Sequence, residues 1–210
     1  PAKILANFAG YFQVDAFPGY DVFFGPQSKM TEVGCWAHAR RYFKRALDSE
    51  KDLALEAMAR IRELYLIERE AKRVGLDPDG VLRLRREKSL PLLESLQIWL
   101  ELVNTQVLDQ GPMAKAIHYT LSNWKALNRF TEDGRLAIDN NAAERGLRTV
   151  AVGRKNWNVV GNERGGQAAA ILFSLVMTCK AIGIDPRTYL KDVLLRIGKE
   201  SDVKKLVPHN

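Results

Sequence analysis

Residues 134–145 read GRLAIDNNAAER, and this stretch places acidic, amide and basic side chains where a short apolar segment meets a helix. Leu136 and Ile138 form the apolar lead-in, and Asn141 is a favourable cap for a helix that begins there. Glu144 then falls in the first helical turn, with an arginine directly after it. A carboxylate held on a rigid element beside arginines is typical of metal-assisted chemistry on phosphates.

The same spacing also permits a purely structural role for Glu144. The pattern Asn-x-x-Glu resembles a capping box, in which the glutamate side chain accepts a hydrogen bond from the backbone N–H of the cap residue. Spacing alone favours this structural role. The catalytic interpretation therefore depends on the rest of the sequence.

Three motifs follow one another along the chain. They are Val14-Asp15, the run GCWAHARRYF at residues 34–43, and the run IDNNAAERGLR at 138–148 with GRKNW at 153–157. In this order they resemble the transposases of the insertion sequence 66 family. The resemblance extends from about Phe8 to Ile197, so it covers nearly the whole chain.

The resemblance implies a ribonuclease-H-like core in which acidic residues hold two divalent cations, Mg²⁺ or Mn²⁺, for DNA strand cleavage and strand transfer. It also implies that Asp15 is the second acid, that Glu144 is the third, and that both are metal ligands. Asp139 is a rival third acid, because it lies at the same strand-to-helix junction. The family's first acid has no counterpart here. We therefore expect this chain to be the C-terminal portion of a catalytic domain and to be inactive alone.

Asp15 and His38 also have structural explanations. Asp15 shortly precedes Pro18-Gly19, where an aspartate commonly stabilises a turn. The resemblance implies that His38, in a Cys-x-x-His pair with Cys35, contacts DNA or the active site, but a core cysteine beside a histidine at a helix start fits equally well. A closed four-ligand zinc site is not expected, because the chain has 2 cysteines and 3 histidines in all.

Basic residues near the acids are the expected DNA contacts, because guanidinium groups bind phosphates in bidentate fashion without reading bases. They are Arg40, Arg41, Arg145, Arg148, Arg154, Lys155 and Arg164. A net charge of +7 agrees with a polyanionic partner but does not establish one. Trp36 and Trp157 are candidates for stacking on an unpaired base, although tryptophan is more common in a core.

Apolar periodicity predicts an α/β chain that is mostly helical, with few strands. The family resemblance implies that these strands belong to a partial ribonuclease-H-like core, which a helical insertion interrupts. We expect strands at 11–14, 30–36 and 157–160. We expect a helix that begins at residue 37, several helices within 47–130, and another at 144–150. Two more should follow: a buried helix at 168–179, and a final helix that begins after Asp185 and ends at Gly198. We assign 1–46 and 131–198 to the catalytic core, 47–130 to the insertion and 199–210 to a flexible tail. Asp15 and Glu144 should then approach one another in the folded chain.

Other features narrow the class of protein. No apolar run is long enough to span a bilayer, no signal peptide is recognised, and two distant cysteines do not form a disulfide framework. We expect a cytoplasmic, nucleoid-associated bacterial protein whose partners are transposon-end and target DNA, accessory transposition proteins and further copies of itself. Two alternatives stay open: another ribonuclease-H-like nuclease such as a resolvase, and a non-catalytic DNA-binding or assembly module.

Overall fold

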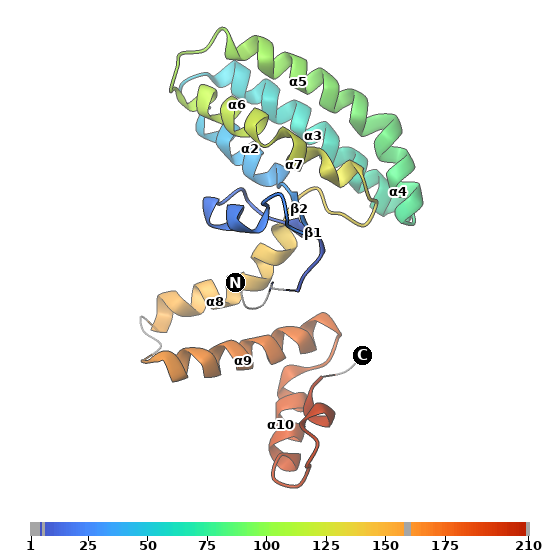
Figure 1. Cartoon of the computed structure of the whole chain (residues 1–210), viewed down its shortest axis with the longest axis vertical. Coiled ribbons are helices and arrows are strands. Elements are labelled where there is room, and N and C mark those ends of the chain that lie inside the picture. Colours follow the sequence, from blue (N-terminus) through green and yellow to red (C-terminus); the bar gives the residue numbers. More distant parts are fainter. Residues whose placement is uncertain (1–4, 6, 158–160, 209–210) are drawn as a thin grey trace. The chain divides into compact units, whose positions relative to one another are not determined.

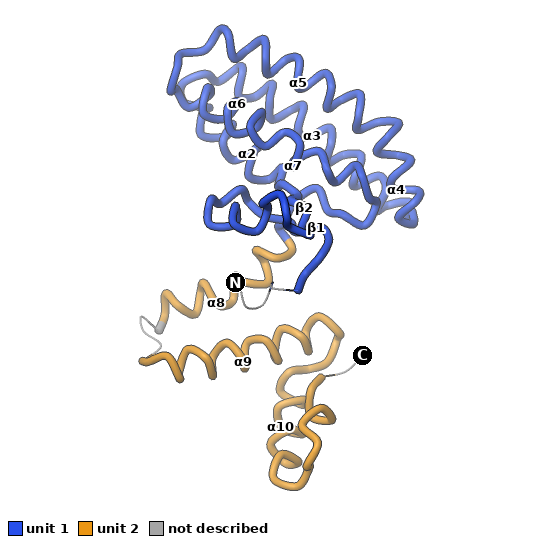
Figure 2. Tube along the Cα trace, viewed as in Figure 1, with its two compact units in different colours: residues 1–141 blue, residues 142–210 orange. Residues whose placement is uncertain are grey.

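The computed structural model of the chain describes residues 5, 7–157 and 161–208, except for the side chain of Trp157. Its contacts divide it into two compact units, Pro1–Asn141 and Ala142–Asn210 (Figure 2). Within the described residues, no helix combines the length and the apolar character needed to cross a membrane.

The first unit combines a small parallel sheet with a bundle of helices (Figure 1). In chain order its elements are β1 (Gly10–Gln13), η1 (Pro18–Phe23), β2 (Met30–Val33), α2 (Trp36–Arg45), α3 (Lys51–Val74), α4 (Pro78–Leu84), η2 (Arg85–Ser89), α5 (Leu90–Asn104), α6 (Pro112–Ser122), α7 (Trp124–Asn128) and η3 (Arg129–Thr131). Residues 47–130, all of them described, contain no strand. This confirms the predicted helical character of that segment.

The sheet brings the carboxyl ends of its two strands to one edge. β1 pairs with β2 in parallel, with Gly10 opposite Met30 and Gln13 opposite Val33. The carboxyl ends of both strands therefore lie at the same edge. β2 is shorter than predicted, because residue 36 already begins α2. Two strands are too few to identify a ribonuclease-H-like core, so that part of the fold class stays a prediction.

The hydrophobic core of the first unit lies where α2, α3, α5 and α6 pack together. Its largest fully buried apolar side chains are Trp36, Phe43, Ile61, Leu64, Leu96, Leu100, Met113, Ile117, Leu127 and Phe130. The indole Nε1 of Trp36 donates a hydrogen bond to the carbonyl oxygen of Leu127 at 2.9 Å. Trp36 is therefore a core residue, which excludes it as a platform for an unpaired base.

Local sequence signals set several helix ends. α3 ends at Gly75, which adopts φ 72°, a left-handed conformation that glycine adopts without steric cost. The side chain of Asp77 caps α4 by accepting a hydrogen bond from the backbone N–H of Gly80 at 2.8 Å. Pro78 and Pro112 occupy the first turns of α4 and α6, where a missing N–H costs nothing.

The second unit contains helices joined by turns and loops, with no strand among its described residues. Its elements are α8 (Asn141–Trp157, beginning at the last residue of the first unit), α9 (Glu163–Ala181), α10 (Pro186–Arg196) and η4 (Val203–Leu206). α8 runs past the predicted end at residue 150, so the prediction of a strand from Trp157 is wrong at its first residue. Residues 158–160 lie outside the described part. Asp185 caps α10 by accepting a hydrogen bond from the Thr188 N–H at 2.8 Å, as its position before Pro186 predicts.

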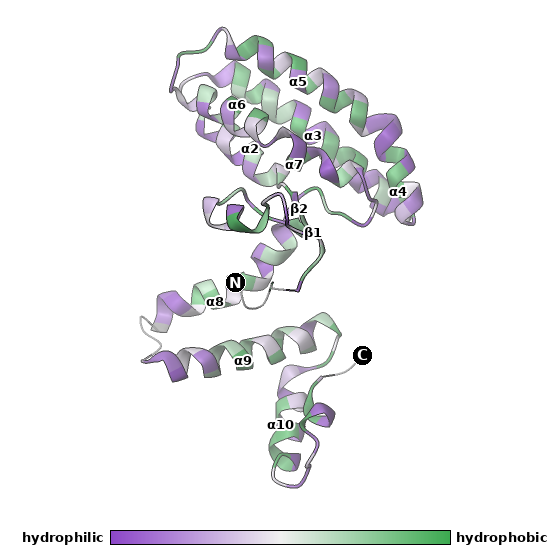
Figure 3. Cartoon of the chain, in the orientation of Figure 1, coloured by the Kyte–Doolittle hydropathy of each residue, from purple (hydrophilic) through white to green (hydrophobic). Residues whose placement is uncertain are grey.

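The helix predicted to be buried at 168–179 has only one buried residue, and its other residues are exposed or half-buried. Ile171 is 62% exposed and Leu172 is 53% exposed, while Cys179 is buried. α9 carries many hydrophobic residues along its length (Figure 3). The apolar run therefore predicted the helix correctly but its burial incorrectly, because hydrophobicity does not say whether a neighbouring element covers a helix face. Nearer the C-terminus, the Tyr189 hydroxyl donates to the Leu206 carbonyl at 2.7 Å and ties η4 to α10.

Candidate functional site

Asp15 lies just beyond the carboxyl end of β1, at the edge where β2 also ends. Its side chain is 39% exposed, so the carboxylate is accessible. The next residue, Ala16, adopts φ 58°, a left-handed conformation that alanine rarely takes. The Tyr119 hydroxyl of α6 donates to the backbone carbonyl of Asp15 at 3.2 Å and fixes this turn. Backbone strain beside an accessible acid is common at functional sites.

His38, on α2, lies next to Asp15 at this edge of the sheet, and we call the site that these two residues form the corner. Its Nε2 lies 3.9 Å from Oδ2 of Asp15 and 3.0 Å from Nη1 of Arg41. A guanidinium only donates hydrogen bonds, so the Arg41 contact uses Nε2 as an acceptor. A carboxylate, an imidazole and a guanidinium therefore meet at the end of the sheet, and all three belong to predicted site residues.

The connection between β2 and α2, at Gly34, packs closely against the backbone of α7. The N–H of Gly34 donates to the carbonyl of Ala126 at 2.8 Å, and a Cβ on Gly34 would lie within 2.9 Å of the backbone nitrogen of Leu127. Only glycine fits there without moving α7. The tight packing at Gly34 thereby fixes the start of α2, and His38 lies in the first turn of that helix.

Residues 138–140 return to this corner from far along the sequence. The Trp36 N–H donates to the carbonyl of Ile138 at 3.1 Å. The Cys35 thiol donates to Oδ1 of Asn140 at 3.1 Å, and the Asn140 N–H donates to Cys35 Sγ at 3.4 Å. Burial raises the pKa of the Cys35 thiol, so it stays protonated and can act as this donor. Cys35 therefore has a structural role at the corner.

Asp139 is held by donors from the protein itself. Its carboxylate accepts hydrogen bonds from the Tyr65 hydroxyl at 2.9 Å, from the Asn141 N–H at 3.1 Å and from Asn141 Nδ2 at 2.7 Å. Burial raises the pKa of Tyr65, and the negative charge of Asp139 raises it further. Asp139 thus ties the start of α8 to α3.

Sequence reasoning missed Arg85, which holds the segment leading into this corner. Its guanidinium is buried and pairs with Glu68 at 2.6 Å. It also donates to the backbone carbonyls of Phe130 at 2.6 Å, Asp133 at 3.0 Å and Leu136 at 2.8 Å. No spacing in the sequence indicates this role, because every acceptor lies at least 17 positions from Arg85.

The predicted DNA contacts fall in both units. Arg40 and Arg41 are exposed on α2 of the first unit. The others are exposed in the second unit: Arg145, Arg148, Arg154 and Lys155 on α8, and Arg164 on α9. Glu144 is half-buried in the first turn of α8. Because Asp15 and Glu144 belong to different units, the expectation that they approach one another stays a prediction.

Among the described residues, no three or more His, Cys, Asp or Glu side chains form a group that could hold a metal ion. In the first unit, the corner offers Asp15 as the accessible carboxylate, since Asp139 already accepts three hydrogen bonds. The corner alone is therefore an incomplete metal site.

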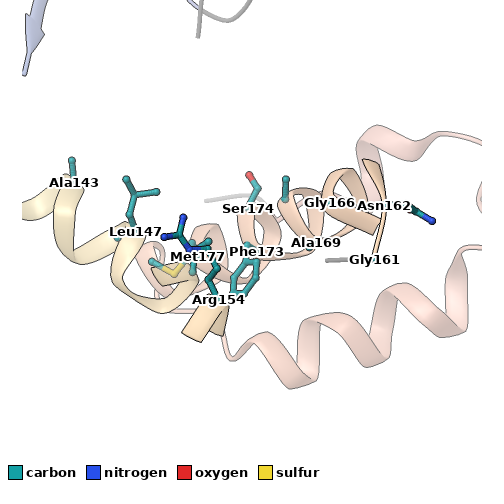
Figure 4. Close-up of a pocket in the computed structure, with 13 residues that line it drawn as sticks. Ala143, Leu147, Arg154, Gly161, Asn162, Gly166, Ala169, Phe173, Ser174 and Met177 are labelled. Atoms are coloured by element: carbon teal, nitrogen blue, oxygen red, sulfur yellow. The ribbon is translucent and has the colours of Figure 1, made fainter. Parts of the chain in front are cut away.

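The second unit contains an apolar groove of about 1090 Å³ between α8 and α9. It is lined by apolar side chains of both helices, Leu147 and Val150 of α8 and Phe173 and Met177 of α9 (Figure 4). Arg154 of α8 also lines it. No carboxylate, histidine or cysteine is among the described residues that line it. Its chemistry does not suit a metal site.

Comparison with known proteins covers almost the whole chain. Residues 1–168 match the family described as Transposase IS66 family, and residues 174–209 match the IS66 C-terminal element. Curated relatives from Sinorhizobium fredii (strain NBRC 101917 / NGR234) include the uncharacterized proteins y4hP, y4jD and y4qI. They are 37%, 36% and 34% identical to this chain over 94%, 98% and 100% of its length.

The chain spans 38%, 42% and 40% of these three relatives, so it corresponds to less than half of each. No solved structure gives a significant match. The family match nevertheless extends over both units and includes the corner at Asp15, His38 and Asn140. This chain belongs to the IS66 family of transposases.

Proposed function

We propose that this chain is the C-terminal part of the catalytic domain of a DNA transposase, which cleaves DNA strands at transposon ends and joins them to target DNA with the help of divalent metal. The observation that carries the proposal is the corner at the end of the sheet. There the accessible carboxylate of Asp15 lies beside His38 and Arg41. Ligands of parallel sheets commonly bind beyond the carboxyl ends of the strands, which is where this corner lies.

The donor chemistry of the site suits Mg²⁺ or Mn²⁺. Both are hard cations that prefer carboxylate and phosphate oxygens. Asp15 and Glu144 would hold the metal together with a first acid from outside this chain, and the bound cation would activate the attacking oxygen and stabilise the leaving one.

Asp139 is an unsuitable third acid for a physical reason. The Asp139 carboxylate already accepts hydrogen bonds from Tyr65 and from two donors of Asn141, so binding a cation would break contacts that hold the start of α8. Asp139 then serves as a positioning residue. Glu144 follows Asn141 by three positions on the same helix and carries the catalytic role.

The basic residues would hold the phosphates of the DNA. Arg41 contacts His38 and so lies beside the reacting phosphate, while the exposed cations of α8 and α9 bind flanking phosphates. Counterion release then makes binding weaken steeply as salt rises. Transposon-end recognition, accessory proteins and self-association belong to the longer protein.

The decisive experiment uses the longer protein that carries the first acid. Asp15→Asn and Glu144→Gln should each abolish Mg²⁺- or Mn²⁺-dependent cleavage of labelled transposon-end DNA, because each removes a metal ligand. DNA affinity should be retained or slightly raised, because a negative charge near phosphate is lost. Gel analysis of cleavage and strand-transfer products, with fluorescence anisotropy for binding, measures both.

Glu163→Gln is the matched control, because Glu163 lies in the first turn of α9 as Glu144 lies in the first turn of α8. It changes charge at a helix start without touching the proposed site, so cleavage should persist. Cleavage retained by Glu144→Gln would reject that residue as the third acid. Metal-dependent cleavage of branched DNA without strand transfer would identify a resolvase. Equal Mn²⁺ binding by the wild type and the Asp15→Asn, Glu144→Gln double variant would identify a non-catalytic module.

A further inference from the structure

A groove of the first unit lies between α2 and α3. These two helices pack against one another (Figure 1). Its volume is about 590 Å³, within the range of sites that bind small organic molecules. Arg40 and Arg41 line it from α2, and Arg62 lines it from α3. All three arginines are exposed. Three guanidinium groups around one hollow make it a strongly cationic site.

Two of the three arginines of this groove, Arg40 and Arg62, are not neutralised by a carboxylate of the described residues. None of the described residues that line the groove is acidic. Among the described residues, neither Arg40 nor Arg62 forms a salt bridge with a carboxylate. Exposed arginines on helices commonly pair with acids three or four positions away, as Arg60 does with Glu56. Arg40 and Arg62 are therefore available to an external anion.

The floor of the groove is apolar rather than charged. Leu55, Met58 and Ala59 line it together with Arg62, at the i, i+3, i+4 and i+7 spacing that forms one face of a helix. Leu55 is 45% exposed. A free inorganic anion would gain nothing from this apolar surface, whereas the face of a nucleobase would lose water against it.

The groove also adjoins the candidate catalytic corner. Arg41 lines it and contacts His38, while Tyr65 and Asn141 line it and bind Asp139. We propose that this groove binds one unpaired nucleotide of the DNA strand beside the cleavage site, with its phosphate on Arg40, Arg41 and Arg62 and its base on Leu55 and Met58. This inference rests on the proposed function for its location, and it assigns Arg62, from the helical segment, to DNA binding.

The test measures binding by the intact 210-residue chain, with no metal or cleavage needed. The probe is a labelled single strand of about 12 nucleotides, a typical length for such sites, compared with a blunt duplex of the same sequence. Arg62→Ala should weaken single-strand binding roughly tenfold, because it removes a charge-assisted phosphate contact. It should also reduce the slope of log affinity against log salt by about 1.

Arg83→Ala on α4 is the matched control, because Arg83 is exposed and does not line the groove. Its affinity should stay within about twofold of the wild type. Circular dichroism melting checks that both variants fold. An abasic strand of the same length keeps the phosphates but lacks bases, so it should bind the wild type more weakly than the normal strand.

Three results would overturn the inference. They are unchanged binding by Arg62→Ala, equal losses for duplex and single strand, and equal affinity for abasic and normal strands. Failure here is distinct from failure of the proposed function. Cleavage that still depends on Glu144 while Arg62→Ala binds normally would reject the groove and leave the transposase assignment intact.

Discussion

The two units of the chain are built from similar helices but differ in what those helices cover. In the first unit, α2, α3, α5 and α6 share a continuous core whose central side chains, such as Leu100, are completely buried. In the second unit, Cys179 and Leu206 are the buried hydrophobic side chains among the described residues, while leucines such as Leu172 and Leu194 are more than half exposed.

This difference shows that helix formation and core formation are separate problems. α9 is a regular helix with a side-chain cap from Asn162, yet most of its apolar surface faces solvent or the groove beside α8. α3 has a weaker local start, with no side-chain cap, but every turn of its buried face meets another helix. Stability should therefore be concentrated in the first unit, where most apolar area leaves water.

The strongest test of this comparison is a matched pair of leucine truncations. Leu100→Ala should lower the free energy of unfolding by about 3–4 kcal/mol, because it leaves a cavity in a packed core. Leu172→Ala should change it by less than about 0.5 kcal/mol, because that side chain is 53% exposed. Urea denaturation followed by circular dichroism measures both. An equally large loss from Leu172→Ala would show that the second unit has a core in solution.

A smaller effect is expected from the buried ion pair of the first unit. Glu68→Gln should cost about 2 kcal/mol, because it leaves the Arg85 guanidinium, only 3% exposed, without its compensating charge. The control is Glu70→Gln on the same helix, whose pair with Lys88 is more than 40% exposed on both sides and should cost less than about 1 kcal/mol. Denaturation midpoints of the two variants give the comparison. Equal costs would mean that Arg85 does not organise residues 130–136.

An element boundary could be predicted from the sequence where contacts within a few residues determine it. Asp77, Pro112 and Asp185 set helix starts through contacts within a few residues, so their positions were predictable. The end of β2 could not be predicted in this way, because Trp36 is as suitable for a strand as for a helix. The burial of Trp36 and its hydrogen bond to Leu127 decide between the two structures.

The candidate site divides along the same line. Motifs indicated Asp15, His38 and Arg41, and the structure brings these three together. The roles of Arg85, Tyr65 and the Cys35–Asn140 pair depend on contacts between residues 17 to 105 positions apart. The groove position of Arg62 likewise depends on packing between α2 and α3, although its i+7 spacing from Leu55 was a signal that could have been noticed.

The smallest expected effect is on stability at alkaline pH, and it compares Cys35, a buried cysteine of the first unit, with Cys179, a buried cysteine of the second unit. Burial raises the pKa of Cys35 above its ordinary value of 9.0, so the folded state favours the thiol that donates to Asn140. That contribution is fully present below about pH 9 and is lost as pH rises through the higher pKa of the folded state. Cys35→Ser keeps a donor but removes this ionisation, so thermal unfolding midpoints should fall less steeply between about pH 8 and pH 9.5. Cys179→Ser should retain the wild-type decline, because Cys35 is still present. A decline that persists in Cys35→Ser would show that another group, such as the partly buried Tyr65, controls the alkaline limit of the first unit.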